Sequence, residues 1–484
     1  MIAVDRKSLK PLHRQIYDAF CTAIVEGGLR PRQRIPSTRV LASELGVSRF
    51  PVLNAYAQLL AEGYFESRVG AGTIVSRSLP DQPTASAATE GRRGLALTGP
   101  RPVSRGASIL PPFDRQPWLR GWGAFGVGQV AFDQFPLQIW SNLVAGHCRN
   151  MDAKSFHYGE SIGSMALRKT VASYLRTTRA LHCEAEQIAI VSGSQQALEI
   201  SARLILDPGS SVWIEDPGYS FARDAFAMTG CRLVPVPVDK EGLDVAAGIK
   251  RCRKARAAFV TPSHQFPLGV TMSASRRLKL LDWAQNTGSW IIEDDYDSEY
   301  RYENSPIPAL QGLDASARGI FIGTFSKVLF PSLRLGYVVV PLDLVDRFLS
   351  IRRAMDIAPP TFYQEVLANF ISEGHFGRHI RRMRVLYRER RSALVAGLRK
   401  EIGGMVEVLG AEAGMHLTVI LPKGSHSDLE IAERAARQNL WVWPLSSSYL
   451  GEAPRQGFIL GFGSTEIVDI PHAVRKLRYL LAAK

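Results

Sequence analysis

A chain of 484 residues is longer than one ordinary core allows, and its 46% hydrophobic and 21% charged residues exclude a disordered or fibrous protein. We therefore expect two or three globular domains. The formal net charge of +14 favours a polyanionic partner, nucleic acid first. The five scattered cysteines form no CxxC pair, so we expect no disulfides and no metal site, which fits a reducing cytoplasm. The sequence shows neither a signal segment nor a membrane-length apolar run, so we expect no membrane span.

The first 78 residues have a helical pattern that ends in two extended runs. Residues 12–26 carry apolar side chains at helical spacing and stop at a Gly-Gly pair. Ser37 and Ser48 can each cap a short helix, and a turn containing glycine joins these helices in a helix-turn-helix pattern. The extended runs on either side of residues 70–72 predict a β-hairpin wing.

This segment is also basic, with eleven Lys or Arg against six Asp or Glu. The second helix of a helix-turn-helix enters the major groove, so we expect Arg49 and Asn54 near base edges. A domain with solvated arginines and no DNA partner is the alternative. The candidate DNA-binding residues are Arg39, Ser48, Arg49, Asn54, Arg68 and Gly72.

The segments PSTRVLASELGVSR, NAYAQLLAEGY and GAGT closely resemble the winged helix-turn-helix of GntR-type bacterial regulators, over about 65 residues. The resemblance implies that the head binds double-stranded DNA. Phe50 and Pro51 depart from the hydroxyl-rich pattern that is common at the start of the reading helix. Proline suits a first helical turn, so this departure concerns base specificity and not the fold.

Residues 79–118 are rich in Pro, Gly, Ser, Ala and Arg, which predicts a flexible linker. From residue 119 to residue 484, apolar runs such as QIAIVSG, SVWIEDPG and GIFIGTFS alternate with longer amphipathic stretches. This alternation predicts a mainly parallel sheet with crossover helices.

Residues 320–337, IFIGTFSKVLFPSLRLGY, place Lys327 at the exit of an apolar run. A lysine at the mouth of a sheet can form a Schiff base with an aldehyde cofactor, and nearby hydroxyls and an arginine suit that cofactor's phosphate. Thr324, Ser326 and Arg334 are the candidates for the phosphate. A structural ion pair is the alternative for Arg334.

This stretch resembles the pyridoxal-phosphate (PLP) lysine motif of fold type I aminotransferases. Over roughly residues 119–484 the resemblance implies a large α/β domain with helices on both faces of its sheet, a smaller C-terminal α+β subdomain, and a homodimer with PLP at the interface. Together with the GntR-like head, it resembles the MocR subfamily of regulators across nearly the whole chain. Such a regulator binds operator DNA, PLP and an amino-compound effector.

Two residues of the stretch SWIIEDDYDSEYRY can bind the cofactor ring. Asp294 and Tyr296 are two residues apart, so their side chains leave an extended strand on the same face. As the family pattern implies, Asp294 faces the ring nitrogen and Tyr296 the phenolic oxygen. The alternative is a solvated acidic loop, for which the better candidates are Glu293, Asp295, Asp297 and Glu299.

Ser194 and Gln195 stand near a helix start, where backbone N–H groups bind anions; an ordinary helix cap is the alternative. By resemblance, Tyr158 reaches the phosphate across a dimer interface and Tyr219 stacks on the cofactor. Either tyrosine can instead be an ordinary core or rim aromatic. His264 occupies the family's Asn-Pro-x-Gly turn, where it can be a simple loop residue.

The largest departure from the family lies near the C-terminus. Aminotransferases bind a substrate carboxylate with an arginine just ahead of the last core strand, since bidentate geometry suits that pair. In GFILGFG the corresponding position is Gly457, and Arg455 is displaced from it. The departure argues against the usual amino-acid substrates and leaves PLP binding untouched.

We therefore expect a PLP-dependent transcriptional regulator that senses PLP, or a PLP–amino compound adduct, through Lys327. Physiological catalysis is not expected, although residual transaminase activity is compatible with the domain. The first alternative is a catalytically active aminotransferase with a fused DNA-binding head. The second is a PLP-binding scaffold with a vestigial head, which predicts no sequence-specific DNA complex.

Overall fold

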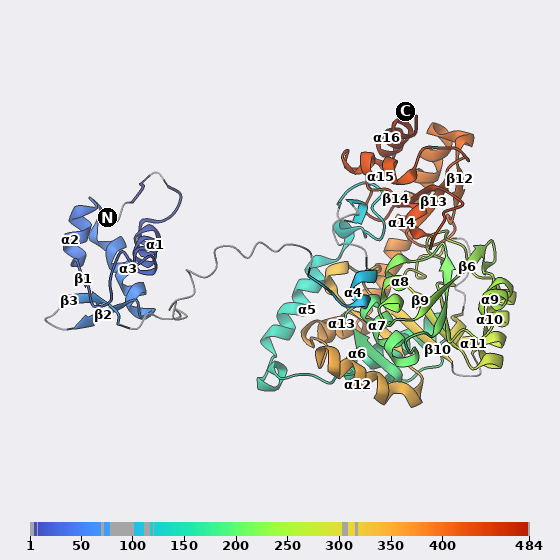
Figure 1. Cartoon of the computed structure of the whole chain (residues 1–484), viewed down its shortest axis with the longest axis horizontal. Helices are drawn as coiled ribbons and strands as arrows, with labels where there is room; N and C mark the ends of the chain where they lie inside the picture. The colour runs from blue at the N-terminus through green and yellow to red at the C-terminus, as the bar shows by residue number, and fades with distance from the viewer. Residues whose placement is uncertain are drawn as a thin grey trace. The chain divides into compact units, whose positions relative to one another are not determined.

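The computed structural model describes residues 4–6, 8–68, 72–77, 101–110, 117–119, 121–302, 308–314 and 318–482. The chain divides into two compact units, Met1–Pro102 (the head) and Val103–Lys484 (the effector unit) (Figure 1). Among the described residues, none of the helices combines the length and apolar content that crossing a bilayer requires.

The head has the predicted winged helix-turn-helix fold. Its strands pair in the order β1-β3-β2, and Arg68 on β2 stands opposite Gly72 on β3, which confirms the hairpin. The helices begin and end close to their predicted limits. The elements are α1 (Leu12–Val25), β1 (Arg34–Ile35), α2 (Thr38–Glu44), α3 (Arg49–Ala61), β2 (Phe65–Arg68) and β3 (Gly72–Val75).

A small aromatic core holds the head together. Phe20, Tyr56 and Phe65 meet edge to face with ring centroids 5.2 to 5.6 Å apart. The Oγ of Ser37 accepts a hydrogen bond from the N–H of Val40 at 3.3 Å, which confirms its predicted cap. Ser48 stands at the N-cap of α3, but its side chain makes no capping hydrogen bond, so that part of the prediction is wrong.

The effector unit is built on one eight-stranded sheet. Its order is β4-β11-β10-β9-β8-β5-β6-β7, in which the neighbours from β10 to β6 run parallel and β11, β4 and β7 join antiparallel. The sheet is therefore mixed, with a parallel centre as predicted. The strands are β4 (Ile188–Val191), β5 (Ser211–Asp216), β6 (Arg232–Asp239), β7 (Gly242–Leu243), β8 (Ala257–Val260), β9 (Trp290–Asp295), β10 (Gly319–Thr324) and β11 (Gly336–Val339).

Helices cover both faces of this sheet, because alternate residues of its strands join different apolar clusters. Ile320 and Ile322 of β10 pack with residues of α7, α8 and α12, whereas Phe321 between them packs with residues of α6, α13 and α14. The helices are α5 (Leu137–Arg149), α6 (Met165–Arg179), α7 (Ser194–Ile205), α8 (Ser220–Ala227), α9 (Val245–Cys252), α10 (Ala274–Thr287), α11 (Leu310–Leu313), α12 (Val345–Asp356), α13 (Phe362–Ser372) and α14 (His375–Glu401).

A smaller C-terminal subdomain follows, as predicted. Its four strands are antiparallel in the order β12-β13-β15-β14, and it occupies one end of the effector unit in orange and red (Figure 1). Its elements are β12 (Glu407–Leu409), β13 (His416–Ile420), α15 (Asp428–Ala436), β14 (Trp443–Pro444), β15 (Gly457–Gly461) and α16 (Ile470–Ala482).

The predicted linker, residues 79–118, is described only in part. Within it lies the short helix α4 (Arg105–Ile109), whose N-cap Ser104 accepts a hydrogen bond from Ala107 N–H at 3.3 Å. Trp118, in the turn Pro117–Leu119, is 7% exposed and belongs to the core of the effector unit. Residues 79–100 and 111–116 lie outside the described part, so the flexibility of the linker stays a prediction.

Candidate cofactor and DNA-binding sites

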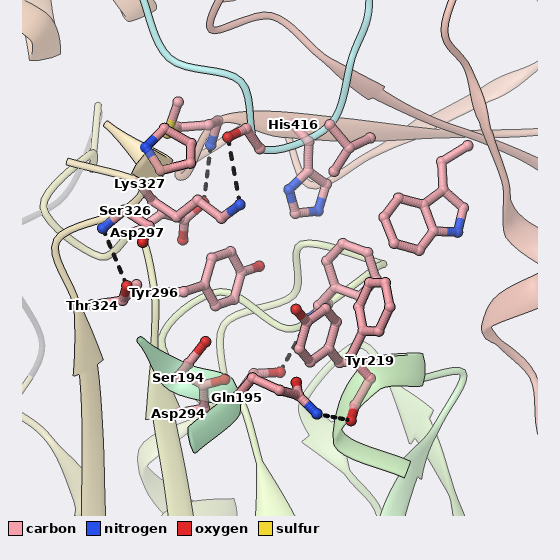
Figure 2. A pocket seen from close by; sticks show the side chains of 18 of the residues that line it. Ser194, Gln195, Tyr219, Asp294, Tyr296, Asp297, Thr324, Ser326, Lys327 and His416 are labelled. Carbon is pink, nitrogen blue, oxygen red and sulfur yellow. Dashed lines mark hydrogen bonds between the residues drawn. The ribbon is translucent and has the colours of Figure 1, made fainter. Parts of the chain in front are cut away.

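A cavity of about 330 Å³ opens where β9 and β10 end, beside the start of α7 and the C-terminal subdomain (Figure 2). Nine of the ten residues predicted to bind the cofactor line this one cavity. They are Ser194, Gln195, Tyr219, Asp294, Tyr296, Thr324, Ser326, Lys327 and Arg334.

Tyr158 is the predicted residue that does not line the cavity. It precedes α6 and is 82% exposed. Its predicted contact crosses a dimer interface, so the role stays a prediction.

Lys327 follows β10 and is half-buried in the cavity wall. Its Nζ donates a hydrogen bond to the carbonyl oxygen of Gly128 at 3.4 Å. Burial lowers the pKa of this amine, and the charges of Asp297 and Asp294 oppose that shift. Since the neutral amine is the form that attacks an aldehyde, the lowered pKa suits the predicted covalent role.

Asp294 lies on β9 and is only 3% exposed. Burial, reinforced by the nearby charges of Asp295 and Asp297, raises its pKa to about 8. Its Oδ1 has no hydrogen-bond partner. A buried carboxyl oxygen without a partner is costly, so this atom fits a ligand that brings an N–H group to it.

The alternative of a solvated acidic loop for residues 293–299 is wrong. Glu293 is 1% exposed, and its carboxylate accepts hydrogen bonds from the backbone N–H groups of Leu310 and Gln311 at 3.0 and 3.2 Å. Asp295 forms a buried ion pair with Arg179.

The other two carboxyl groups of this run also have partners. Asp297 accepts a hydrogen bond from the backbone N–H of Met415 at 3.0 Å, and half-buried Glu299 accepts one from Tyr174 Oη at 3.1 Å. Neither side chain is a solvated surface group.

A buried polar cluster supports Tyr296. The Oη of Tyr296 donates to the backbone carbonyl of His264 at 2.8 Å, and the Nδ1 of His264 lies 3.1 Å from both carboxylate oxygens of Asp297. His264 is therefore more than a loop residue, although it does not line the cavity.

His416 completes this cluster and does line the cavity. Burial, together with the nearby His264 ring, lowers the pKa of His416 to about 3, so its imidazole is neutral at neutral pH. Potential metal-ligand atoms of His264, Asp297 and His416 lie within 4.8 Å of one another, but His264 and Asp297 already bond to each other.

The start of α7 and Arg334 form a site for an anion. Gly193, the N-cap of α7, has φ +97°, and a Cβ atom on it would lie 3.4 Å from Nη1 of Arg334. The guanidinium therefore stands against the helix N-terminus, where backbone N–H groups favour a phosphate. Within the described part of the chain Arg334 makes no ion pair with an acidic residue, so the structural ion-pair alternative gains no support.

Two predicted phosphate-site residues also have protein partners. Thr324 Oγ1 accepts a hydrogen bond from the backbone N–H of Ser326 at 3.1 Å. Gln195 donates its amide to the carbonyl of Phe221 at 2.9 Å, which holds its side chain against α8.

Among the described lining residues, the cations are Lys327 and Arg334. Gly457 has no room for a side chain, because a Cβ there would collide with the carbonyl oxygen of Val419. Arg455 is half-buried and does not line the cavity, so neither position provides a carboxylate-binding arginine.

The neighbouring position of the last strand is apolar as well. Ile459 of β15 stands opposite Trp443 of β14, so the two side chains share one face of the small sheet. Trp443 lines the cavity. The small sheet thus contributes an indole to the cavity, and Arg334 is the one arginine among the described lining residues.

Several residues that line the cavity were not predicted from the sequence as binding residues. Asp297 stood in the acidic run that follows β9, so its sequence position was a signal. Thr261 and Phe266 lie on either side of His264, in the stretch that stands in the family's Asn-Pro-x-Gly turn, so they also had a signal. Other lining residues come from segments far apart in the chain and carried none: Gly128, Met415, His416 and Trp443.

These residues fit PLP. PLP supplies an aldehyde for a lysine, a phosphate for cations and N–H groups, and a ring whose protonated nitrogen withdraws electrons. The amine of Lys327, the unpartnered oxygen of Asp294 and the anion site at Arg334 match these three groups in kind.

The head exposes most of its candidate DNA-binding residues. Arg39 on α2 and Arg49 and Asn54 on α3 are exposed, as is Ser48 before α3. Gly72 begins β3 with φ +86°, and a Cβ there would lie 3.3 Å from the guanidinium of Arg34. Arg68 ends β2, and its side chain is outside the described structure.

Both units match known families. Residues 12–75 match the bacterial regulatory proteins of the gntR family, and residues 124–458 match aminotransferase class I and II. The chain is 39% identical to the probable rhizopine catabolism regulatory protein MocR of Rhizobium meliloti, over 99% of this chain and 95% of that protein. The chain belongs to the MocR subfamily of GntR-type transcriptional regulators.

Other relatives of this MocR-type chain agree. It is 29% identical to the HTH-type pyridoxine biosynthesis transcriptional regulator PdxR of Corynebacterium glutamicum, over 99% of this chain and 97% of that protein. LysN, an α-aminoadipate aminotransferase of Thermus thermophilus solved with N-(5'-phosphopyridoxyl)-L-leucine, matches with a TM-score of 0.72 and 27% identity, over 78% of this chain and 97% of that one. The effector unit of this MocR-type chain therefore has the fold type I architecture.

Proposed function

We propose that this protein is a transcriptional regulator that binds operator DNA through its head and senses PLP, or a PLP–amino compound adduct, through Lys327. The observation that carries the proposal is one cavity in which Lys327, Asp294 and Arg334 meet, in a chain that also has a GntR-type head. Residues 1–78 are the DNA-binding domain, residues 79–118 the linker and residues 119–484 the effector domain.

Each side chain at the site has a proposed role. Lys327 binds the aldehyde covalently, and Asp294 holds the proton of the ring nitrogen. Tyr296, fixed by its bond to the carbonyl of His264, donates to or accepts from the phenolic oxygen. Ser194, Gln195, Thr324, Ser326 and Arg334 hold the phosphate, Tyr219 stacks on the ring, and Tyr158 reaches the phosphate from a partner subunit.

Regulation follows from linkage between the two ligands. The protein acts as a homodimer with two heads, on nucleoid DNA in the cytoplasm. A ligand that favours one arrangement of the effector units changes the placement of the heads, and hence the affinity for the operator. By reciprocity, operator DNA changes the affinity for PLP by the same factor.

Operator binding in the presence and absence of PLP tests this proposal. A footprint on the DNA upstream of the protein's own gene should appear, and its half-saturation concentration should shift when PLP or PLP with an amine is added. Lys327→Ala should bind the same DNA without that shift. A protein that binds PLP but protects no DNA, or protects it identically with and without PLP and amine, contradicts the proposal.

A working aminotransferase is the second candidate, because Lys327, Asp294 and Tyr296 suffice for PLP chemistry. The lack of a carboxylate-binding arginine among the described lining residues argues against it. Steady-state assays with amino donors and a keto-acid acceptor separate the two functions. We expect turnover far below the median of about 10 per second for enzymes, and vigorous turnover at physiological donor concentrations would establish the second candidate.

A further inference from the structure

The outer face of α3 is largely apolar. The inner face packs into the head through Val52, Ala55, Tyr56 and Leu59. On the outer face Phe50 is 69% exposed, Leu53 41% and Leu60 36%, and the exposed Ala57 lies between the two leucines. A surface helix normally presents polar side chains to water, so this exposed apolar face indicates a surface that binds a partner.

The first turn of α3 is the part of the helix that we expect to contact the bases of DNA. In a helix-turn-helix the N-terminal residues of the second helix contact base edges in the major groove. Here these residues are Arg49 and Phe50, the first two of the helix. The Nε of Arg49 already donates to Thr38 Oγ1 at 3.1 Å, which ties this arginine to the start of α2.

Phe50 has no group that can form a hydrogen bond with a base. In the major groove the C5-methyl group of thymine is the apolar feature that distinguishes one base from the others, and phenylalanine is among the side chains that contact it. Asn54 stands one helical turn after Phe50 on the same exposed side, where its amide can pair with adenine.

From this geometry we infer that Phe50 reads the methyl group of a thymine in each operator half-site, which makes it a specificity-determining residue. The inference rests on the proposed DNA-binding function. Charge favours DNA over a protein as the occupant of this face. Exposed Arg49 precedes Phe50, exposed Arg39 lies near the start of α2, to which Arg49 bonds, and the first 78 residues carry a net charge of +5.

Uracil substitution tests the inference, because it removes the methyl group and keeps the base pair. The full-length protein, loaded with PLP, is used to select its sites from a random duplex library. Each thymine of a selected site is then replaced singly by deoxyuridine, and binding is measured by fluorescence anisotropy. At one thymine in each half-site the replacement should weaken wild-type binding about fourfold, the cost of losing one buried methyl group.

Phe50→Ala is measured on the same duplexes, with Leu60→Ala as the matched control. Leu60 is exposed on the same helix but lies near its C-terminal end. Phe50→Ala should bind the thymine and uracil duplexes alike, whereas Leu60→Ala should keep the fourfold preference. Both positions are exposed, so thermal unfolding should change little for either variant.

Three outcomes are decisive. If no thymine is sensitive to the replacement, or if Phe50→Ala keeps the wild-type preference for thymine, Phe50 does not read a methyl group. If Phe50→Ala changes the assembly state and leaves the thymine preference intact, the apolar face docks on protein. If a PLP-loaded protein selects no sequence at all, the proposed regulatory function fails, which is a separate result.

Discussion

The Nζ atom of Lys327 lies 3.4 Å from the carbonyl oxygen of Gly128, to which it donates a hydrogen bond. Gly128 has φ +74°, and a Cβ atom on it would collide with that same Nζ. The lysine therefore leaves the end of β10 and crosses to a segment that lies 199 residues away in sequence. This contact places the amine inside the cavity and away from bulk water.

Lys327→Ala should abolish the covalent attachment of PLP. The variant removes the amine that lines the cavity, so borohydride reduction should leave no pyridoxyl group on the protein. Peptide mapping by mass spectrometry measures the result. Lys279→Ala removes an exposed lysine of α10 and should label like the wild type; a labelled peptide in Lys327→Ala would mean that another lysine binds the aldehyde.

Asp294→Asn should change how the stability of the PLP-free protein depends on pH. The pKa of Asp294 is about 8 in the folded chain, against ~3.9 when unfolded. Between these values the folded chain holds a proton that the unfolded chain has released, so the free energy of unfolding falls as pH rises through that window. Asparagine cannot ionise, so the variant should lose less stability than the wild type between ~pH 5 and ~pH 9.

Urea unfolding at several pH values measures this difference. Glu215 and Glu293, whose pKa values burial raises to about 7, contribute a similar slope to both proteins and cancel in the comparison. Asp282→Asn, at an exposed position on α10, should follow the wild-type curve. A constant difference between Asp294→Asn and wild type across the range would contradict the raised pKa.

Arg334→Gln should weaken the binding of PLP far more than that of pyridoxal. A hydrogen bond to a charged group is worth ~1.5 to 3 kcal/mol, so we expect the affinity for PLP to fall about ten- to a hundredfold. Pyridoxal lacks the phosphate and should bind both proteins alike. Equilibrium dialysis with each compound measures the effect, and an equal loss for both would place Arg334 elsewhere than at the phosphate.

Arg39→Ala should weaken binding to all DNA duplexes by the same factor. Its exposed side chain near the start of α2 suits a phosphate contact, so the slope of log affinity against log salt should become less steep by about 0.9. Arg203→Ala removes the same charge from α7 of the effector unit and should leave the slope unchanged. DNA-binding titrations of each protein at three or more salt concentrations measure this slope.

Local signals predicted the head well. Helix limits depend on glycines and on capping residues such as Ser37, which lie within a few positions of the ends they set. The missing bond at Ser48 shows the limit of that reasoning, because a serine can stand at the N-cap of a helix without its side chain accepting a hydrogen bond from a backbone N–H. The fold of the effector unit followed from strand-like runs separated by helical stretches.

Long-range pairing was not predictable in the same way. Nothing near β11 indicates that it inserts antiparallel between β4 and β10. The burial of Asp295 depends on Arg179, which lies 116 residues earlier in the chain, so the acidic run looks solvated when considered alone. His416 and Trp443 reach the cavity because the C-terminal subdomain folds back onto it.

The backbone around Gly128 also has a consequence for signal transmission. Ala124 and Phe125 accept hydrogen bonds from the N–H groups of Trp441 and Gly461 in the C-terminal subdomain, at 2.9 and 3.0 Å. Gly128 accepts one from Lys327. Leu119, the first residue after the predicted linker, lines the cavity as well. The part of the effector unit that follows the linker therefore contributes to the cavity wall. We expect a ligand that displaces the bond between Lys327 and Gly128 to act first on this segment.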